Sequence, residues 1–257
     1  MLKSADPYLR FVLLTGVAKF SKVSIFSDLN NLNDITISNT YGQMLGCTYK
    51  ELEHYFSEYI DKLAKETEES LEETLYNIEH WYNGYCFSKE NLRVYNPFSL
   101  LLLFKHLDFR NYWFETGTPS FLINLIKEKD YDVRNIENIE ANEMAFSAFE
   151  IDKLQIIPLL FQTGYLTIKD YDKRKRHYKL YYPNFEVEES FLTYIAESLS
   201  SVKAYEVSSY LFKCIDALEE NDLAIFFDNL KVFFADINYE LHIKEEKYYQ
   251  TIFYVIF

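Results

Sequence analysis

Glycine and proline are scarce in this sequence, with six and five residues among 257. Turn-rich all-β folds use many of both, so the scarcity disfavours such a fold and favours long helices. Cysteine is scarce as well, because Cys47, Cys86 and Cys214 lie far apart and form no Cys-x-x-Cys pair. Their number and spacing suggest neither a zinc site nor a disulfide framework, and they predict a reducing cytoplasm as the compartment.

Basic residues are fewer than acidic residues. The chain has 26 basic and 40 acidic residues, which give a net charge of −14. A field of that sign repels phosphate backbones, so any contact with a nucleic acid needs a local basic cluster. Long apolar runs are lacking too: Pro97–Phe104 and Thr251–Phe257 are far shorter than the roughly 20 residues that span a bilayer. We therefore expect a soluble cytoplasmic protein.

Helical signals dominate what is present and predict a mainly α fold with minor β structure, of the α+β class. Thr48 and Glu51 have the spacing of a capping box, in which both side chains satisfy free amides of the first helical turn. A second helix is predicted from about Ser70 to Tyr82, ended by the Asn-Gly pair that follows. Two further helices are predicted to begin at the Asn-Pro pair at 96–97 and at the Thr-Pro pair at 118–119. Residues 151–161 are predicted to be helical with an interruption at Pro158, and residues 184–199 are predicted to form the next helix. A pair of helices is predicted within 207–234, with Asp222 as the cap between them.

Strand signals are fewer. The short apolar run Phe11–Leu14 predicts a buried strand. Residues 164–169 alternate as a strand, 170–177 read as a charged hairpin tip, and 178–183 return. A helix, a two-stranded hairpin and a second helix follow one another in the order expected of a winged-helix unit.

The stretch from Arg10 to Lys22, RFVLLTGVAKFSK, has the outline of a phosphate-binding loop that follows a strand. A P-loop needs G-x-x-x-x-G-K-S/T, so that successive backbone amides surround the phosphate. Here Gly16 is followed by Val-Ala-Lys-Phe-Ser, with no second glycine and no Gly-Lys pair. The spacing therefore rejects a P-loop and leaves a core strand with a polar end.

The densest basic cluster consists of Lys173, Arg174, Lys175 and Arg176, followed by His177. Four positive charges on a winged-helix hairpin could contact a nucleic-acid backbone, so these residues are candidates for such binding. The alternative is an ordinary solvated hairpin tip. The five histidines share no ligand spacing, so the sequence predicts no metal site.

Five strings, several of them rich in aromatic residues, together resemble the bacterial AAA-ATPase-like family, whose members often carry a C-terminal nuclease-like domain of the PD-(D/E)XK superfamily. The strings are residues 14–35, 81–87, 94–99, 112–119 and 159–168. The resemblance implies that the chain begins and ends inside a longer protein. It implies the tail of a P-loop ATPase core at 1–45, a helical lid region at 46–150, a winged-helix-like segment at 151–200, a helical connector at 201–237, and the first helix of a truncated nuclease-like domain at 238–257.

The resemblance also assigns roles to individual residues. Thr15 would end the strand beside the Walker B strand, where such ATPases sense the γ-phosphate, and Lys19 and Lys22 would face phosphates just beyond it. Glu246 would match a metal-positioning carboxylate of the nuclease-like domain, although a solvated helix charge is the alternative. The Walker A lysine, the Walker B acids and the Glu-x-Lys of an active nuclease have no counterpart in this sequence.

Two functions remain open at this stage. In the first, the longer protein binds ATP and Mg²⁺ and couples them to a nuclease-like domain, while this chain alone is not catalytic and needs no cofactor. In the second, the chain is a non-catalytic module that contacts a protein or a nucleic acid through the hairpin and the aromatic helices.

Overall fold

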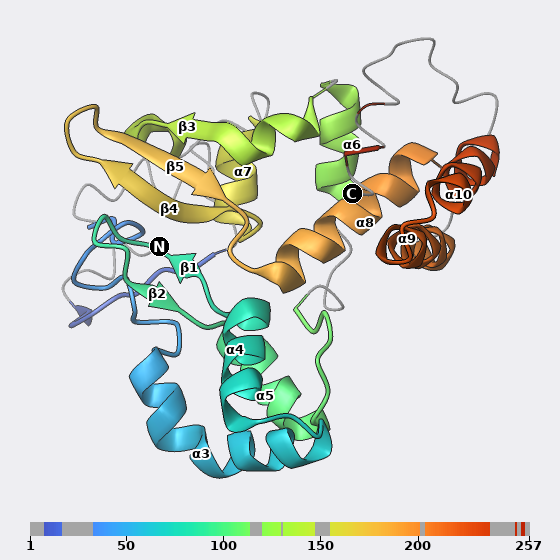
Figure 1. Ribbon diagram of the computed structural model, residues 1–257. Helices are drawn as coiled ribbons and strands as arrows, with labels where there is room; N and C mark the ends of the chain where they lie inside the picture. The colour runs from blue at the N-terminus through green and yellow to red at the C-terminus, as the bar shows by residue number, and fades with distance from the viewer. Residues whose placement is uncertain are drawn as a thin grey trace. The chain divides into compact units, whose positions relative to one another are not determined.

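The computed structural model describes residues 8–16, 33–113, 120–129, 131–146, 155–200, 204–236, 250 and 253–254. Helices and short strands are mixed (Figure 1), which confirms the α+β class. The chain divides into two compact units, Met1–Trp113 with Ile136–Glu186, and Phe114–Asn135 with Val187–Phe257. The family-based boundaries at 45, 150, 200 and 237 stay a prediction.

Two helices of the first unit begin at capping boxes. In α3 (Tyr49–Glu66), the Glu51 amide donates to the Thr48 hydroxyl at 3.3 Å, and the Thr48 amide donates to the Glu51 carboxylate at 2.8 Å. Ser70 and Glu73 exchange the same pair of bonds at the start of α4 (Leu71–Tyr82), which ends at the cap residue Asn83. Both predicted helices are confirmed.

A third helix, α5 (Pro97–His106), completes a small apolar core with α3 and α4. Asn96 accepts the amide hydrogen of Phe98 at 3.0 Å, and Pro97 fills the first turn, as predicted. The core joins buried side chains of all three helices, among them Leu52, Leu63, Ile78, Tyr82, Leu100 and Leu103. Burial of these side chains is the main stabilising contribution of this part of the fold.

Two small sheets complete the first unit. One is the antiparallel pair β1 (Tyr85–Cys86) and β2 (Arg93–Val94). The other has the order β3-β5-β4, in which β5 (His177–Tyr181) lies between β3 (Ile139–Ala141) and β4 (Thr167–Asp172) (Figure 1). The predicted hairpin is confirmed, but its first strand begins at Thr167 rather than at residue 164, and β3 adds a strand that the sequence did not reveal.

One buried charge connects helix and loop within the first unit. The carboxylate of Glu186, in the first turn of α8 (Phe185–Ser200), is completely buried. It accepts the hydroxyl hydrogen of Ser99 at 2.8 Å and the amide hydrogen of Trp113 at 2.7 Å. A buried carboxylate is tolerated only when its oxygens are hydrogen-bonded, and here both of them are.

Two predictions about local structure were wrong. The predicted buried strand Phe11–Leu14 is irregular, and the side chain of Phe11 is 80% exposed. A strand needs a neighbour for its backbone hydrogen bonds, and the described part of the chain offers this run no such partner. Pro158 does not interrupt a helix, because α7 (Ile156–Gln162) begins only two residues earlier and accommodates proline in its first turn.

The second unit contains α6 (Ser120–Glu128), the part of α8 from Val187 onward, α9 (Ala204–Glu219) and α10 (Leu223–Asp236). Asp222 caps α10, since its carboxylate accepts the amide hydrogen of Ile225 at 3.0 Å, as predicted. The helix predicted from 118–119 is present as α6, and the predicted start at 118–119 lies outside the described residues. Among the described helices, none combines the length and the apolar character needed to cross a membrane.

Gly84 should be the least replaceable glycine of the first unit. Its φ is +117°, and an added Cβ would lie 2.0 Å from the carbonyl oxygen of Pro183. We expect Gly84→Ala to lower the free energy of unfolding by about 3 kcal/mol or more, through backbone strain and a clash with another backbone segment.

Gly164 provides the matched control, because its φ is +87° but an added Cβ meets nothing closer than 3.5 Å. Gly164→Ala should therefore cost only about 1 kcal/mol of strain. Urea denaturation followed by circular dichroism measures both values. Equal costs for the two variants would contradict the close approach of Gly84 and Pro183.

Candidate nucleic-acid interface

The turn at residues 173–176 joins β4 to β5 and carries the four cations of the predicted interface. The carboxylate of Asp172 accepts the amide hydrogens of Arg174 and Lys175 at 2.8 and 2.9 Å. The amide of Arg176 donates to the carbonyl of Asp172 at 2.7 Å, and Arg176 adopts a left-handed φ of 58°. Local bonds thus fix a four-residue turn whose cationic residues are all exposed.

Three of these cations differ from the fourth in their ion pairing. In the part of the chain that the structure describes, the side chains of Lys173, Arg174 and Lys175 form no ion pair. Arg176 differs, because its guanidinium lies 3.7 Å from the carboxylate of Glu143. An adjacent row of unpaired cations on a short, ordered turn is an arrangement that binds phosphate oxygens.

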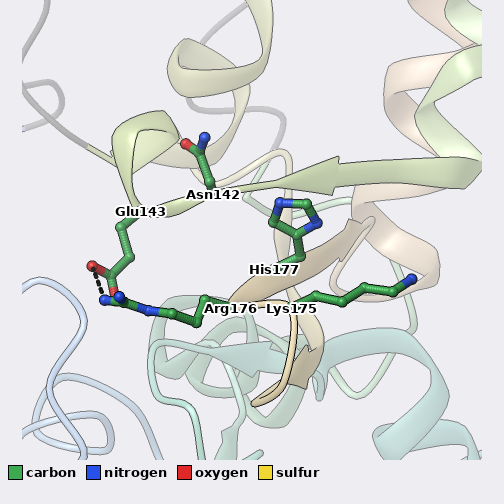
Figure 2. A pocket seen from close by; sticks show the side chains of 5 residues that line it. All are labelled: Asn142, Glu143, Lys175, Arg176 and His177. Atoms are coloured by element: carbon green, nitrogen blue, oxygen red, sulfur yellow. Dashed lines mark ion pairs between the residues drawn. The ribbon is translucent and has the colours of Figure 1, made fainter.

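An open pocket lies beside this turn. It is lined by Asn142, Glu143, Lys175, Arg176 and His177. Figure 2 shows Arg176 reaching toward Glu143, while Lys175 extends in the opposite direction. Glu143 begins the short 3-10 helix η4 (Glu143–Phe146), immediately after β3, so the sheet itself brings this carboxylate to the hairpin.

Lys89, in the loop between β1 and β2, contacts Glu143, one of the residues that line the pocket. Its ammonium donates to Glu143 at 2.8 Å and lies over the rings of Tyr171 and Tyr178, at 5.0 and 5.7 Å from their centroids. The hydrogen bonds to Glu143 and Tyr178 raise the pKa of Lys89, and the same contact with Lys89 lowers the pKa of Glu143. Both groups are therefore charged at neutral pH.

Acidic side chains limit the positive charge of the interface. Glu140 lies 3.7 Å from Nδ1 of His177, Asp172 accepts amide hydrogens of the turn, and Glu143 lies 3.7 Å from Arg176. These three carboxylates accompany five cations, namely Lys89 and the four residues of the turn. With His177 neutral, these groups sum to +2 (five minus three), although the chain as a whole carries −14.

Of the other predicted site residues, the structure describes Thr15. Thr15 is exposed in an irregular segment and does not end a strand, because the run before it forms none. Lys19, Lys22 and Glu246 lie outside the described residues. Within the described ranges, no group of three or more His, Cys, Asp or Glu side chains could hold a metal ion. The three cysteines are free thiols, and burial raises the pKa of Cys47 and Cys214.

Sequence reasoning missed Lys89. The residue stands in an ordinary polar loop, and its nearest partner, Glu143, lies 54 residues away along the chain. No spacing rule connects two such positions, so only the folded arrangement of β1, β3 and the hairpin could reveal the contact.

Comparison with known proteins adds a relative but no activity. No family model matches the sequence, and no solved structure matches it. A protein of Azotobacter chroococcum mcd 1, described as an uncharacterized protein in the vnfD 5′ region, is 36% identical over 266 residues. The match covers 99% of this chain but 48% of that protein, so the chain spans about half the length of its relative.

The Asp172 carboxylate should titrate below its ordinary range. The amide hydrogen bond from Lys175 is the largest cause of its lowered pKa. Because the folded pKa is lowered, the carboxylate stabilises the turn above the ordinary value of about 3.9 and loses this effect as the pH falls through the lowered pKa. NMR titration of the amide signals of Arg174 and Lys175 should give a midpoint below that value.

Asp172→Asn is the control, since it keeps an acceptor oxygen but cannot titrate. Its amide signals at Arg174 and Lys175 should show no midpoint in the acidic range. A wild-type midpoint at the ordinary value would contradict the hydrogen bonds that shape the turn.

Proposed function

We propose that this chain is a non-catalytic portion of a bacterial AAA-ATPase-like protein, and that its β4–β5 hairpin binds the phosphate backbone of a nucleic acid. The observation that carries the binding role is the row of three exposed cations, Lys173, Arg174 and Lys175, without ion pairs in the described part of the chain. We further propose that the hairpin and the helices that precede and follow it in the chain, α7 and α8, form a winged-helix-like segment that acts in the cytoplasm.

The electrostatics of the whole chain set the conditions for such binding. A net charge of −14 repels a polyanion at long range, so contact depends on the local charge at the hairpin. Three phosphate contacts to single-stranded nucleic acid would give a salt slope of about −2, from roughly 0.7 per contact. Affinity should therefore be weak, nonspecific and strongest at low ionic strength.

Neutralising the turn should abolish this binding. The variant has Gln in place of Lys173, Arg174, Lys175 and Arg176. At about 50 mM salt, the wild type should raise the fluorescence anisotropy of a fluorescein-labelled oligothymidylate in a salt-dependent manner. The variant should leave this anisotropy unchanged, because the phosphate contacts are gone.

The matched control replaces four exposed lysines of α3 and α5, Lys50, Lys62, Lys65 and Lys105, by Gln. Both variants then carry a net charge of −18, which is −14 minus 4. The control should retain the binding of the wild type. Equal losses in the two variants would show a general charge effect and overturn the role of the hairpin.

For the longer protein we propose ATP and Mg²⁺ as ligands and coupling to a nuclease-like domain. Support comes from the five family-like strings and from a relative that is about twice as long as this chain. Thr15, Lys19, Lys22 and Glu246 keep their proposed roles only in that longer protein. Its Walker A and Walker B residues would have to lie outside this sequence.

This chain alone should not bind ATP tightly, because it lacks counterparts of the Walker A lysine and the Walker B acids. In a thermal-shift measurement, about 1 mM Mg·ATP should leave the midpoint of unfolding where magnesium sulfate of equal ionic strength leaves it. A dissociation constant 100-fold below the ATP concentration would instead add about 2.7 kcal/mol of stability. The resulting rise of several degrees would contradict the proposal.

A further inference from the structure

Glu143 lies between two cations of the interface. One carboxylate oxygen accepts the Lys89 ammonium hydrogen at 2.8 Å, and the other lies 3.7 Å from a guanidinium nitrogen of Arg176. Figure 2 marks the second of these contacts with a dashed line. Each of these two cations thus contacts a different oxygen of one anion. The same arrangement suits the two free oxygens of a phosphodiester.

Lys89 is held in place for such a contact. Its ammonium lies over the rings of Tyr171 and Tyr178, and its side chain is only 34% exposed. These cation–π contacts hold the ammonium beside the hairpin, which lowers the entropy lost when an anion binds. Glu143, in contrast, is 51% exposed and can turn toward solvent.

We infer that Lys89 and Arg176 form a seat for one backbone phosphate, and that Glu143 occupies this seat until a phosphate displaces it. The inference rests on the proposed binding of nucleic acid by the hairpin, and it adds a residue and an internal competitor to that site. One anion, the phosphodiester, then faces the two cations in place of another, the carboxylate, which turns toward solvent. The unpaired cations of the turn then bind the neighbouring phosphates.

Glu143→Gln tests the competitor directly. Removing its charge frees both cations, so binding of the labelled oligothymidylate should tighten about two- to fivefold, the range measured for exposed charge pairs. Glu140→Gln is the matched control, because Glu140 is 52% exposed, stands on β3 and contacts His177 rather than Lys89 or Arg176. Its affinity should change less than that of Glu143→Gln.

Lys89→Met tests the seat itself, since methionine keeps the contact with the tyrosine rings but has no charge. We expect affinity about two- to fivefold below that of the wild type. In the Lys89→Met background, Glu143→Gln should increase the affinity for the oligothymidylate less than it does in the wild type. The reason is that Glu143 competes with the phosphate through its contact with Lys89, which this background lacks.

The outcomes separate the two proposals. If the wild type binds with salt dependence but Glu143→Gln and Glu140→Gln behave alike, the seat is wrong and the binding role of the hairpin stands. If Glu143→Gln gains as much with Met at position 89, Lys89 has no part in the seat. If the wild type does not bind the oligonucleotide at all, the proposed function fails and the seat fails with it.

Discussion

The interface depends on a hydrogen-bonded contact between two strands that do not share a ladder. The buried hydroxyl of Thr167, at the start of β4, accepts the Cys86 amide hydrogen at 2.7 Å and donates to the Cys86 carbonyl at 3.0 Å. The segment of β1 also meets the chain just beyond β5, where Gly84 approaches Pro183. Lys89 follows Cys86 by three residues, so these contacts bring its loop against the hairpin. Without them, the turn would still carry its four cations, but Lys89 would have no fixed position.

Cations and carboxylates together shape the interface at the β4–β5 hairpin. An acidic chain concentrates five cations around one hairpin, and it uses carboxylates to shape the site as well as to balance it. Asp172 folds the turn through backbone amides, whereas Glu143 links Lys89 to Arg176. Because most of these groups are exposed, their pairwise contributions to stability are small. Their arrangement matters more for what the surface can bind than for how firmly the protein folds.

The sequence predicted the features that local bonds determine. The capping box at Thr48 and the hairpin turn each involve residues close together in the chain, so their patterns can be recognised from the sequence alone. Features that need distant partners were either not predicted or predicted wrongly. The strands β1, β2 and β3 are two or three residues long, and Phe11–Leu14 has strand composition but no described neighbour. The contact of Lys89 with Glu143 belongs to the same class, since each partner alone is an ordinary surface residue.

The most direct test of this account is a ¹⁵N NMR titration of the lysine and arginine side chains with an oligothymidylate at low salt. The account predicts that the signals of Lys89 and of the turn residues 173–176 shift together, while those of the lysines on α3 and α5 do not. Shifts spread evenly over the basic side chains, or confined to groups away from the hairpin, would contradict it.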